Sequence, residues 1–433
     1  MGGTWTTQNK VLPGAYVNFL SNKPLAIDIA DRGTVSIPMI MNWGDKGKLY
    51  EVYPSDNTLK TLGYDQTNSA MMPVKEALKC ASKALVYKVN GGQKAKATIV
   101  TGVTATAKCE GTRGNDISVV IAANAATWDI RTFVGIDVVD TQTVTDFSSF
   151  KSNGWIDIAG TGNIGAATVK LSGGSNTTPT DADYTDYLAA MKTQFFNTIA
   201  YTGTDIAIAN KIAAFVKDQR ENEGIKIQAV LSGVDSDYEG IIVVDNGIIL
   251  NGGSILPKNE ACAWVAGVTA GAKITESNTN KKYDGAVDVY PRLTRSEKEE
   301  KIKLGKFIFT VNERQQVTAL YDINSLTTFT ANKSKDFRKN RVIRTLDNIN
   351  NDVVTIFESN YMGKINNNAD GRSILRGTLI EYFNELQRLG AIQNFKNEDV
   401  AVKTGTDNDA VVIDVYVQPV DSAEKFYINV NVA

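Results

Sequence analysis

The sequence of 433 residues contains no histidine at all. Histidine is the commonest general base and the commonest metal ligand in proteins, so its absence excludes Ser-His-Asp and Cys-His catalysis and every zinc site that uses histidine. Only three cysteines occur, Cys80, Cys109 and Cys262, and they are widely separated. An odd, scattered set can form neither a disulfide framework nor a four-cysteine metal site within one chain, and buried free thiols are the simpler interpretation. We therefore expect no catalytic, cofactor-binding or metal-binding residues.

Long apolar runs, a leader segment and an excess of charge of one sign are also missing. No run approaches the roughly 18 apolar residues of a membrane span, and Met1–Thr6 lacks the basic and apolar regions of a signal peptide. The 46 Lys and Arg nearly balance the 48 Asp and Glu, so overall charge gives no argument for nucleic acid. We expect a protein made in a cytoplasm, released if at all by lysis, and not inserted directly into a membrane.

The apolar content of 42% is enough for packed cores, and the length predicts two or three domains. Alternating helix and strand patterns over 26–92 and 174–332 predict a discontinuous α/β core. Short Thr, Val and Ile runs separated by turn residues over 93–173 predict an inserted all-β domain, a sandwich or a barrel. Residues 333–423 predict an α+β domain with two amphipathic helices and a hairpin of 400–403 and 411–417.

Two helices of the core have clear patterns. A stripe from Tyr184 through Phe195 to Ile199 recurs at helical spacing, and Ile206–Glu223 predicts a second helix. The strands Ile225–Leu231 and Ile241–Val244 are continuously apolar, which is typical of strands buried on both faces of a parallel sheet.

Two glycine-rich segments could suggest ligand binding. Gly160–Gly165 has the spacing G-x-G-x-x-G, but a dinucleotide site needs a helix to begin at the last glycine, and the residues that follow predict a strand and then a turn. Glu110–Asp116 could hold an anion, although turn glycines with one arginine are common. We interpret both as structural turns.

A basic segment opens the last hundred residues. Six cations against Asp336 alone fall between 333 and 344: Lys333, Lys335, Arg338, Lys339, Arg341 and Arg344. Three interpretations remain open: a solvated helix face, docking to an acidic protein partner, and nucleic-acid binding, for which aromatic residues are few.

The two ends of the chain are its most informative segments. Residues 1–25 predict an N-terminal arm with a strand-like piece, Val11–Leu20, in which Val17 and Phe19 lie opposite Tyr16. Residues 424–433 predict a C-terminal arm in which Phe426, Ile428, Val430 and Val432 alternate with polar or aromatic neighbours.

No proline or charge follows Lys425, although monomeric proteins normally protect such edges. The strand either belongs to its own sheet or completes the sheet of a neighbour. Exchange of the second kind is head-to-tail and generates rings or filaments.

Several segments resemble the contractile phage tail sheath proteins of phages and phage-like particles of Gram-positive bacteria. The resemblance covers most of the chain and is densest from 225 onward. The segments are Glu110–Ile117, Tyr238–Ile242, Ala263–Gly271, Asp322–Phe329, Phe337–Asp347, Asn367–Arg372 and Val417–Lys425.

This resemblance implies a structural subunit and no enzyme. Such proteins stack as hexameric rings around a rigid tail tube, and their contraction drives the tube through a cell envelope. It implies that Val11–Leu20 and Phe426–Val432 extend the sheets of neighbouring subunits, and that the basic residues of 333–344 face the tube. The implied partners are further copies of the chain, the tail tube protein, and the baseplate and tail terminator proteins, without nucleic acid. The implied location is the tail of a virion or of a phage-like, bacteriocin-type particle.

Two other classes of function stay open at this stage. An enzyme that uses carboxylate chemistry is possible in principle because Asp and Glu are abundant, but no paired-carboxylate motif stands out. Another self-assembling protein, a tail tube or a surface-layer subunit, is the main alternative. Tube proteins are usually much shorter, and a surface-layer protein would need an export signal.

Overall fold

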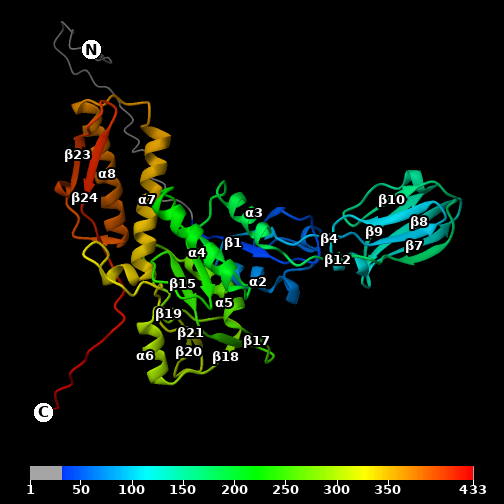
Figure 1. Cartoon of the computed structure of the whole chain (residues 1–433), viewed down its shortest axis with the longest axis horizontal. Coiled ribbons are helices and arrows are strands. Elements are labelled where there is room, and N and C mark those ends of the chain that lie inside the picture. The colour runs from blue at the N-terminus through cyan, green and yellow to red at the C-terminus, as the bar shows by residue number, and fades with distance from the viewer. Residues whose placement is uncertain (1–31, 433) are drawn as a thin grey trace, which may run out of the picture.

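The structure is a computed structural model that describes residues 32–432. Three parts follow one another along the long axis of the molecule (Figure 1). A helical C-terminal part lies at one end, an α/β body lies in the middle, and a β-sandwich projects from the far side of the body. The predicted N-terminal arm, with Val11, Tyr16, Val17 and Phe19, lies outside the described residues.

The body is built on a seven-stranded sheet in which only the edge strand β2 is antiparallel to its neighbour. The continuous apolar run Ile241–Val244 forms a strand whose four residues are all buried, as the sequence predicts. From one edge to the other, the strands are β19 (Lys306–Phe307), β15 (Ile241–Val244), β14 (Gln228–Ser232), β13 (Thr198–Ala200), β1 (Thr34–Met39), β3 (Lys83–Lys88) and β2 (Leu49–Val52).

Helices cover both faces of this sheet. Side chains of α2 and α5 form one core with Val230, whereas those of α3 and α4 form a second core with Ala229 and Leu231, the neighbours of Val230 on the other face. The helices of the body are α1 (Leu59–Leu62), α2 (Met72–Leu78), α3 (Asp181–Met191), α4 (Ile206–Glu221) and α5 (Lys258–Gly271).

One helix expectation is wrong in its extent. The stripe from Tyr184 to Ile199 does not form one helix, because α3 ends at Met191 and Ile199 lies in β13. The apolar residues beyond Met191 keep the helical spacing, but they belong to the turn and to a short strand buried in the centre of the sheet.

The small residues of α5 have a packing reason. A Cβ atom on Gly267 would lie 2.2 Å from the carbonyl oxygen of Ala77, and one on Gly271 would lie 2.0 Å from that of Cys80. Only glycine lets α5 approach α2 so closely, which accounts for this stretch of the sequence.

The inserted part is a sandwich of a three-stranded and a four-stranded antiparallel sheet, which confirms the all-β expectation and excludes the barrel. It joins the body through a neck in which β4 (Gly92–Gln93) pairs with β12 (Ser175–Asn176). The strands of the two sheets are β5 (Lys96–Val100), β6 (Val103–Ala107) and β10 (Ile156–Gly160), and β7 (Ile117–Asn124), β8 (Thr127–Val134), β9 (Asp137–Val144) and β11 (Ala167–Lys170).

Two small sheets and a charged helix lie below the body in Figure 1. Strand β16 pairs with both β17 and β18, and β20 pairs with β21. The elements are β16 (Gly247–Leu250), β17 (Ile255–Leu256), β18 (Ala286–Tyr290), α6 (Arg295–Lys303), β20 (Phe309–Val311) and β21 (Val317–Ala319).

The C-terminal part packs two long helices against a hairpin, as the sequence predicts. The predicted basic helix begins later than expected, because 335–338 forms a short 3-10 turn and the α-helix starts at Asn340. The elements are α7 (Asn340–Asn360), α8 (Ala369–Leu389), β22 (Ile392–Gln393), β23 (Val400–Thr404), β24 (Val411–Val415) and β25 (Gln418–Pro419).

Within residues 32–432, no helix has both the length and the apolar character that a membrane span requires. The same residues contain no group of three or more Cys, Asp and Glu side chains arranged to hold a metal ion.

Candidate assembly surfaces

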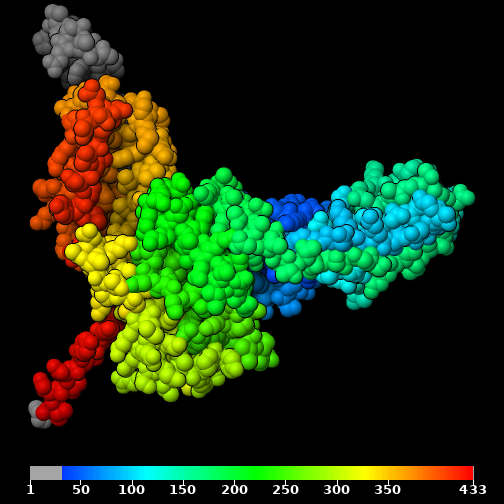
Figure 2. Space-filling view, in the orientation of Figure 1, coloured from blue at the N-terminus to red at the C-terminus, as the bar shows by residue number. Residues whose placement is uncertain are grey.

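The C-terminal segment runs away from the subunit (red in Figures 1 and 2). Its large apolar side chains are between 74% and 92% exposed: Phe426, Tyr427, Ile428, Val430 and Val432. None of residues 426–432 has a strand partner among residues 32–432. The segment therefore does not belong to a sheet of its own subunit, and its apolar side chains are left in solvent.

The hairpin of the C-terminal part has unpaired edges. Strands β23 and β24 bond to each other from Val400–Val415 to Thr404–Val411, and neither has another strand partner within the described residues. One face of the hairpin packs on α8 through Val402 and Ile413, and on the other face Val412 is half exposed. The hairpin is thus one layer of sheet that can accept a strand at either edge.

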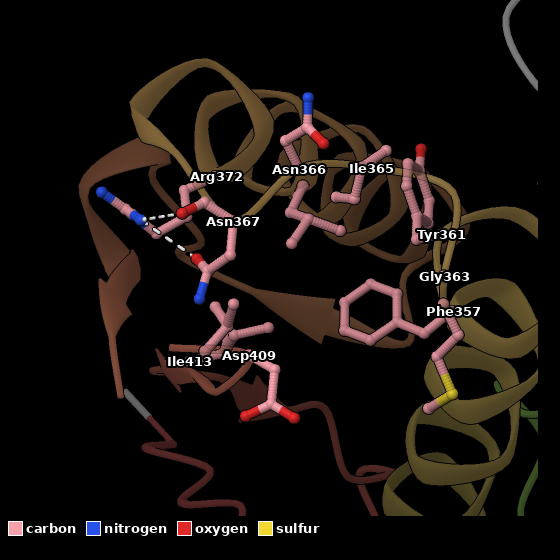
Figure 3. A pocket seen from close by; sticks show the side chains of 12 residues that line it. Phe357, Tyr361, Gly363, Ile365, Asn366, Asn367, Arg372, Asp409 and Ile413 are labelled. Carbon is pink, nitrogen blue, oxygen red and sulfur yellow. Dashed lines mark hydrogen bonds between the residues drawn. The ribbon is translucent and has the colours of Figure 1, made fainter. Parts of the chain in front are cut away.

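A pocket of about 270 Å³ lies beside this hairpin (Figure 3). Its apolar walls come from Phe357 at the end of α7, from Ile365 in the α7–α8 connection, and from Val411 and Ile413 of β24. Asn367 holds the connection in place, because its side-chain amide donates to the backbone oxygens of residues 408 and 410 in the hairpin turn.

Arg372 completes that arrangement by donating to the side-chain oxygen of Asn367 at 3.0 Å. These bonds give a structural reason for the Asn367–Arg372 segment singled out in the sequence: it joins the helix connection to the hairpin and keeps the pocket in shape.

A second cavity, of about 590 Å³, lies between α6 and the 3-10 turn 335–338. We call it the basic cleft, because seven cations and only one acid, Glu299, line it. The cations are Arg295, Lys298, Lys303, Lys335, Arg338, Lys339 and Lys425.

Tyr321 also lines the basic cleft, and its ring attracts two of the cations. The amine of Lys339 lies 4.1 Å from the ring centroid and that of Lys425 lies 6.0 Å from it. Burial lowers the pKa of Arg338, whose Nε and Nη2 have no hydrogen-bond partner among residues 32–432. Lys339 is paired with Glu424 and Arg295 with Glu299, whereas the other five cations have no ion pair with residues 32–432. The cleft therefore holds positive charge that the described chain neutralises only in part.

The six basic residues predicted as one group are divided by the structure. Lys335, Arg338 and Lys339 line the basic cleft, while Lys333 forms an ion pair with Glu239 at 2.7 Å. The remaining two, Arg341 and Arg344, are buried in the subunit, and Lys339 is buried as well although it lines the cleft. The interpretation of 333–344 as a solvated helix face is thus wrong for Lys339, Arg341 and Arg344, and a tube-facing role stays a prediction.

The buried cations join the C-terminal part to the body. Arg344 is fully buried, donates to the backbone oxygen of Glu276 at 2.6 Å, and lies 3.5 Å from Asp322. On the neighbouring turn, Asp347 accepts two hydrogen bonds from Arg220 of α4. Sequence reasoning missed this junction, because its partners lie far apart in the chain.

The segment Glu110–Asp116 stabilises the neck of the sandwich. Arg113 donates from Nε to the carbonyl oxygen of Gly63 at 3.0 Å, and its guanidinium carbon lies 4.5 Å from the ring centroid of Tyr64. A Cβ atom on Gly111 would lie 2.1 Å from the carbonyl oxygen of Asn42. The only arginine of the segment is therefore occupied by its own chain. The other glycine motif, 160–165, runs from β10 to β11, so a strand follows it as expected.

Comparison with known proteins accounts for the chain from residue 32 to its end. Four family models match: the N-terminal region of domain III of a tail sheath protein (32–89), the β-sandwich domain (90–177) and the central domain (177–325) of phage tail sheath proteins, and their C-terminal domain (332–433). The sequence is 36% identical to the phage-like element PBSX protein XkdK of Bacillus subtilis, over all of this chain and 99% of that protein.

Solved structures agree with these matches. The sheath tail protein of Desulfitobacterium hafniense is 44% identical, with a TM-score of 0.88 over 96% of this chain and 99% of that one. The sheath tail protein of Listeria innocua is 35% identical, with a TM-score of 0.79 over 92% and 94%. The contracted helical sheath of the anti-feeding prophage shares the fold alone, at 12% identity and a TM-score of 0.59 over 98% and 99%.

Proposed function

The chain belongs to the phage tail sheath family, and we propose that it polymerises as stacked hexameric rings around a tail tube and contracts to drive the tube through a target envelope. The observation that carries this proposal is a pair of complementary features in one subunit. These are an exposed apolar arm without a strand partner and a hairpin with unpaired edges, both within the described residues. Proteins of this family form the tails of phages or phage-like particles, which implies a structural rather than a catalytic role.

The number of predicted arms equals the number of edges of the β23–β24 hairpin. The hairpin has two edges to offer, those of β23 and β24, and the sequence predicts two arms to donate, Val11–Leu20 and Phe426–Val432. A subunit that gives two strands and receives two makes head-to-tail contacts, which close into rings or continue as a helix. The main chain of each donated strand supplies the hydrogen bonds, and each large apolar side chain that becomes fully buried adds about 1.5–3 kcal/mol.

We propose that the basic cleft faces the tail tube. Its unneutralised cations fit an acidic surface, and electrostatic complementarity of this kind sets orientation and register more than affinity. Of the six residues that the sequence predicts to face the tube, Lys335 and Arg338 line the cleft without an ion pair among residues 32–432. Lys339 is paired with Glu424, and Arg341 and Arg344 are buried, so we assign the role to Lys335 and Arg338. Baseplate and tail terminator proteins are the partners we expect at the two ends of the sheath.

Contraction, on this proposal, repacks subunits that keep their fold. The sheath is assembled in a metastable packing in the host cytoplasm, and the free energy stored in that packing is released as the rings move closer together. The arms act as tethers during the change, so that neighbours stay linked while their other contacts are replaced.

The test is co-expression of the chain with its tail tube protein, followed by negative-stain electron microscopy. The wild-type chain should form hollow tubes of stacked rings, and deletion of 426–433 should leave folded subunits that do not polymerise. Charged substitutions on the apolar side of the arm, Ile428→Asp and Val430→Asp, should have the same effect.

The matched controls, Asn429→Asp and Asn431→Asp, add the same charges on the opposite side of the strand and should leave assembly intact. Sheaths of normal length from the truncated chain, or equal loss of assembly in both pairs of variants, would contradict the role proposed for the arm.

A further inference from the structure

We propose that Glu424 anchors the C-terminal arm and fixes the point and direction at which it leaves the subunit. This inference rests on the proposed function, because an exit point matters only if the arm reaches a neighbour. Glu424 immediately precedes Lys425 and the exposed apolar segment. It is a positioning residue for the link between subunits.

The carboxylate of Glu424 is held from three sides. Its Oε1 accepts hydrogen bonds from Ser277 Oγ at 2.9 Å and from Thr279 Oγ1 at 2.6 Å, and its Oε2 forms an ion pair with Lys339. The side chain of Glu424 is only 7% exposed. A carboxylate that is buried and bonded in this way is far harder to displace than one in a surface ion pair. If it left the site, its buried partners would lose their hydrogen-bond acceptor.

These partners belong to two different parts of the subunit. Ser277 and Thr279 lie in the connection after α5 of the body, whereas Lys339 is the N-cap residue of α7. Burial opposes the charge of Lys339, yet the hydrogen bond to Glu424 raises the pKa of its amine above the ordinary value. The root of the arm is therefore fastened at the junction of the body and the C-terminal part.

The boundary between held and free chain is sharp. Upstream, the backbone N–H of Val420 donates to Ala391, and the hydroxyl of Ser422 accepts from Arg341 at 2.7 Å. Downstream, Phe426–Val432 has no hydrogen bond with residues 32–432. Glu424 is the last side chain that the subunit holds by hydrogen bonds before the arm begins.

The consequence for assembly follows from chain geometry. If Glu424 were released, the next hold would be Ser422, and residues 423–425 would be added to the free arm. Three more residues extend the reach by about 10 Å, since an extended chain spans up to about 3.3–3.6 Å per residue. That is about two inter-strand spacings, so a loosened arm could no longer position a neighbour closely.

The experiment measures arm release in dispersed subunits, before any sheath forms. Trypsin cleaves after Lys425, and mass spectrometry follows the released peptide 426–433. Two variants loosen the anchor without changing the cleaved sequence: Lys339→Met, and Ser277→Ala combined with Thr279→Val. We expect each to raise the rate of release about tenfold or more, because cleavage needs the bonds around Glu424 to open.

The control is Lys282→Met, which removes a nearby lysine whose only ion pair, with Asp284, is exposed, and which should release the peptide at the wild-type rate. Thermal melts show whether each variant is folded, and Ser277→Ala alone provides a milder change if the others are not. The anchoring role of Glu424 would be overturned if both folded variants, Lys339→Met and the double variant Ser277→Ala with Thr279→Val, released the peptide at the wild-type rate.

The second readout is assembly of the Ser277→Ala, Thr279→Val variant with the tube protein. Short or irregular sheaths together with faster release support the anchor, whereas regular sheaths together with faster release overturn its positioning role. Failure of the wild-type chain to form sheaths would instead count against the proposed function, and it would leave the proteolysis result unaffected.

Discussion

Breaking the ion pair between Arg220 and Asp347 should destabilise the subunit more than any change to a surface pair. Arg220 donates from Nη1 and Nη2 to the two oxygens of Asp347 at 2.7 and 2.8 Å, and a further bond from Nη1 reaches the carbonyl oxygen of Ile227 at 2.9 Å. The two side chains are 6% and 7% exposed. Burial opposes the charge of the guanidinium, but Asp347 outweighs it and raises the pKa of Arg220.

In Asp347→Ala, the guanidinium stays buried with one acceptor in place of three. Removing one partner of a buried pair typically costs about 3–5 kcal/mol, because the charge that remains is neither hydrated nor paired. The loss should change little when salt is added, since buried pairs are poorly screened. Replacing both partners, as in Arg220→Met with Asp347→Leu, should recover much of the loss, because no charge is then left unpaired.

Urea unfolding of dispersed subunits, followed by circular dichroism, measures these differences. The control is Glu385→Ala, which removes a pair with Arg388 of similar two-bond geometry on the exposed surface of α8. It should change stability little, because exposed pairs contribute little. A loss in Asp347→Ala as small as that of the control would refute the argument that this pair joins the C-terminal part to the body.

Two further predictions concern helix packing and acid stability. Gly267→Ala should cost about 1–3 kcal/mol, because the new methyl meets the carbonyl of Ala77. Gly377→Ala, in an exposed turn of α8 with no atom within 4 Å of the new methyl, should raise the melting temperature instead. Burial alone would raise the pKa of the Asp237 carboxyl. Hydrogen bonds from the backbone amides of Thr327 and Thr328 outweigh burial and lower this pKa to about 2. The contribution of Asp237 to the free energy of unfolding is thus present above the ordinary pKa near 4 and is lost as pH falls towards 2. Asp237→Asn should therefore flatten the dependence of the unfolding free energy on pH in that window. An unchanged dependence would contradict this prediction.

Patterns of a few consecutive residues predict much of this fold. The buried strand Ile241–Val244 and the hairpin around residues 400–417 follow from apolar runs and alternation, which depend only on nearby positions. The same reasoning failed after Met191, where a turn and a three-residue strand happen to continue the helical spacing. A strand that short carries too little pattern to be separated from a helix.

Charge partners could not be predicted, because they lie far apart in the sequence. Lys339 and Glu424 are 85 positions apart, and Arg220 and Asp347 are 127 apart. A run of cations such as 333–344 looks the same whether its partners belong to the same chain or to another. Only the fold shows that Arg344 is neutralised internally while Lys335 remains available at the basic cleft.

The arrangement of these charges bears on how a sheath subunit can change its neighbours without changing its fold. Buried pairs at Arg220, Arg344 and Glu424 fasten the body, the C-terminal part and the root of the arm to one another. Directly after this fastened region, residues 426–432 are held by nothing in residues 32–432. If rings repack as we propose, we expect the backbone to rotate where no buried pair is broken, which is at the φ and ψ angles from Lys425 onward rather than at the junction. The proposed contraction would use both properties, because a loose junction would absorb the motion within each subunit instead of passing it along the sheath.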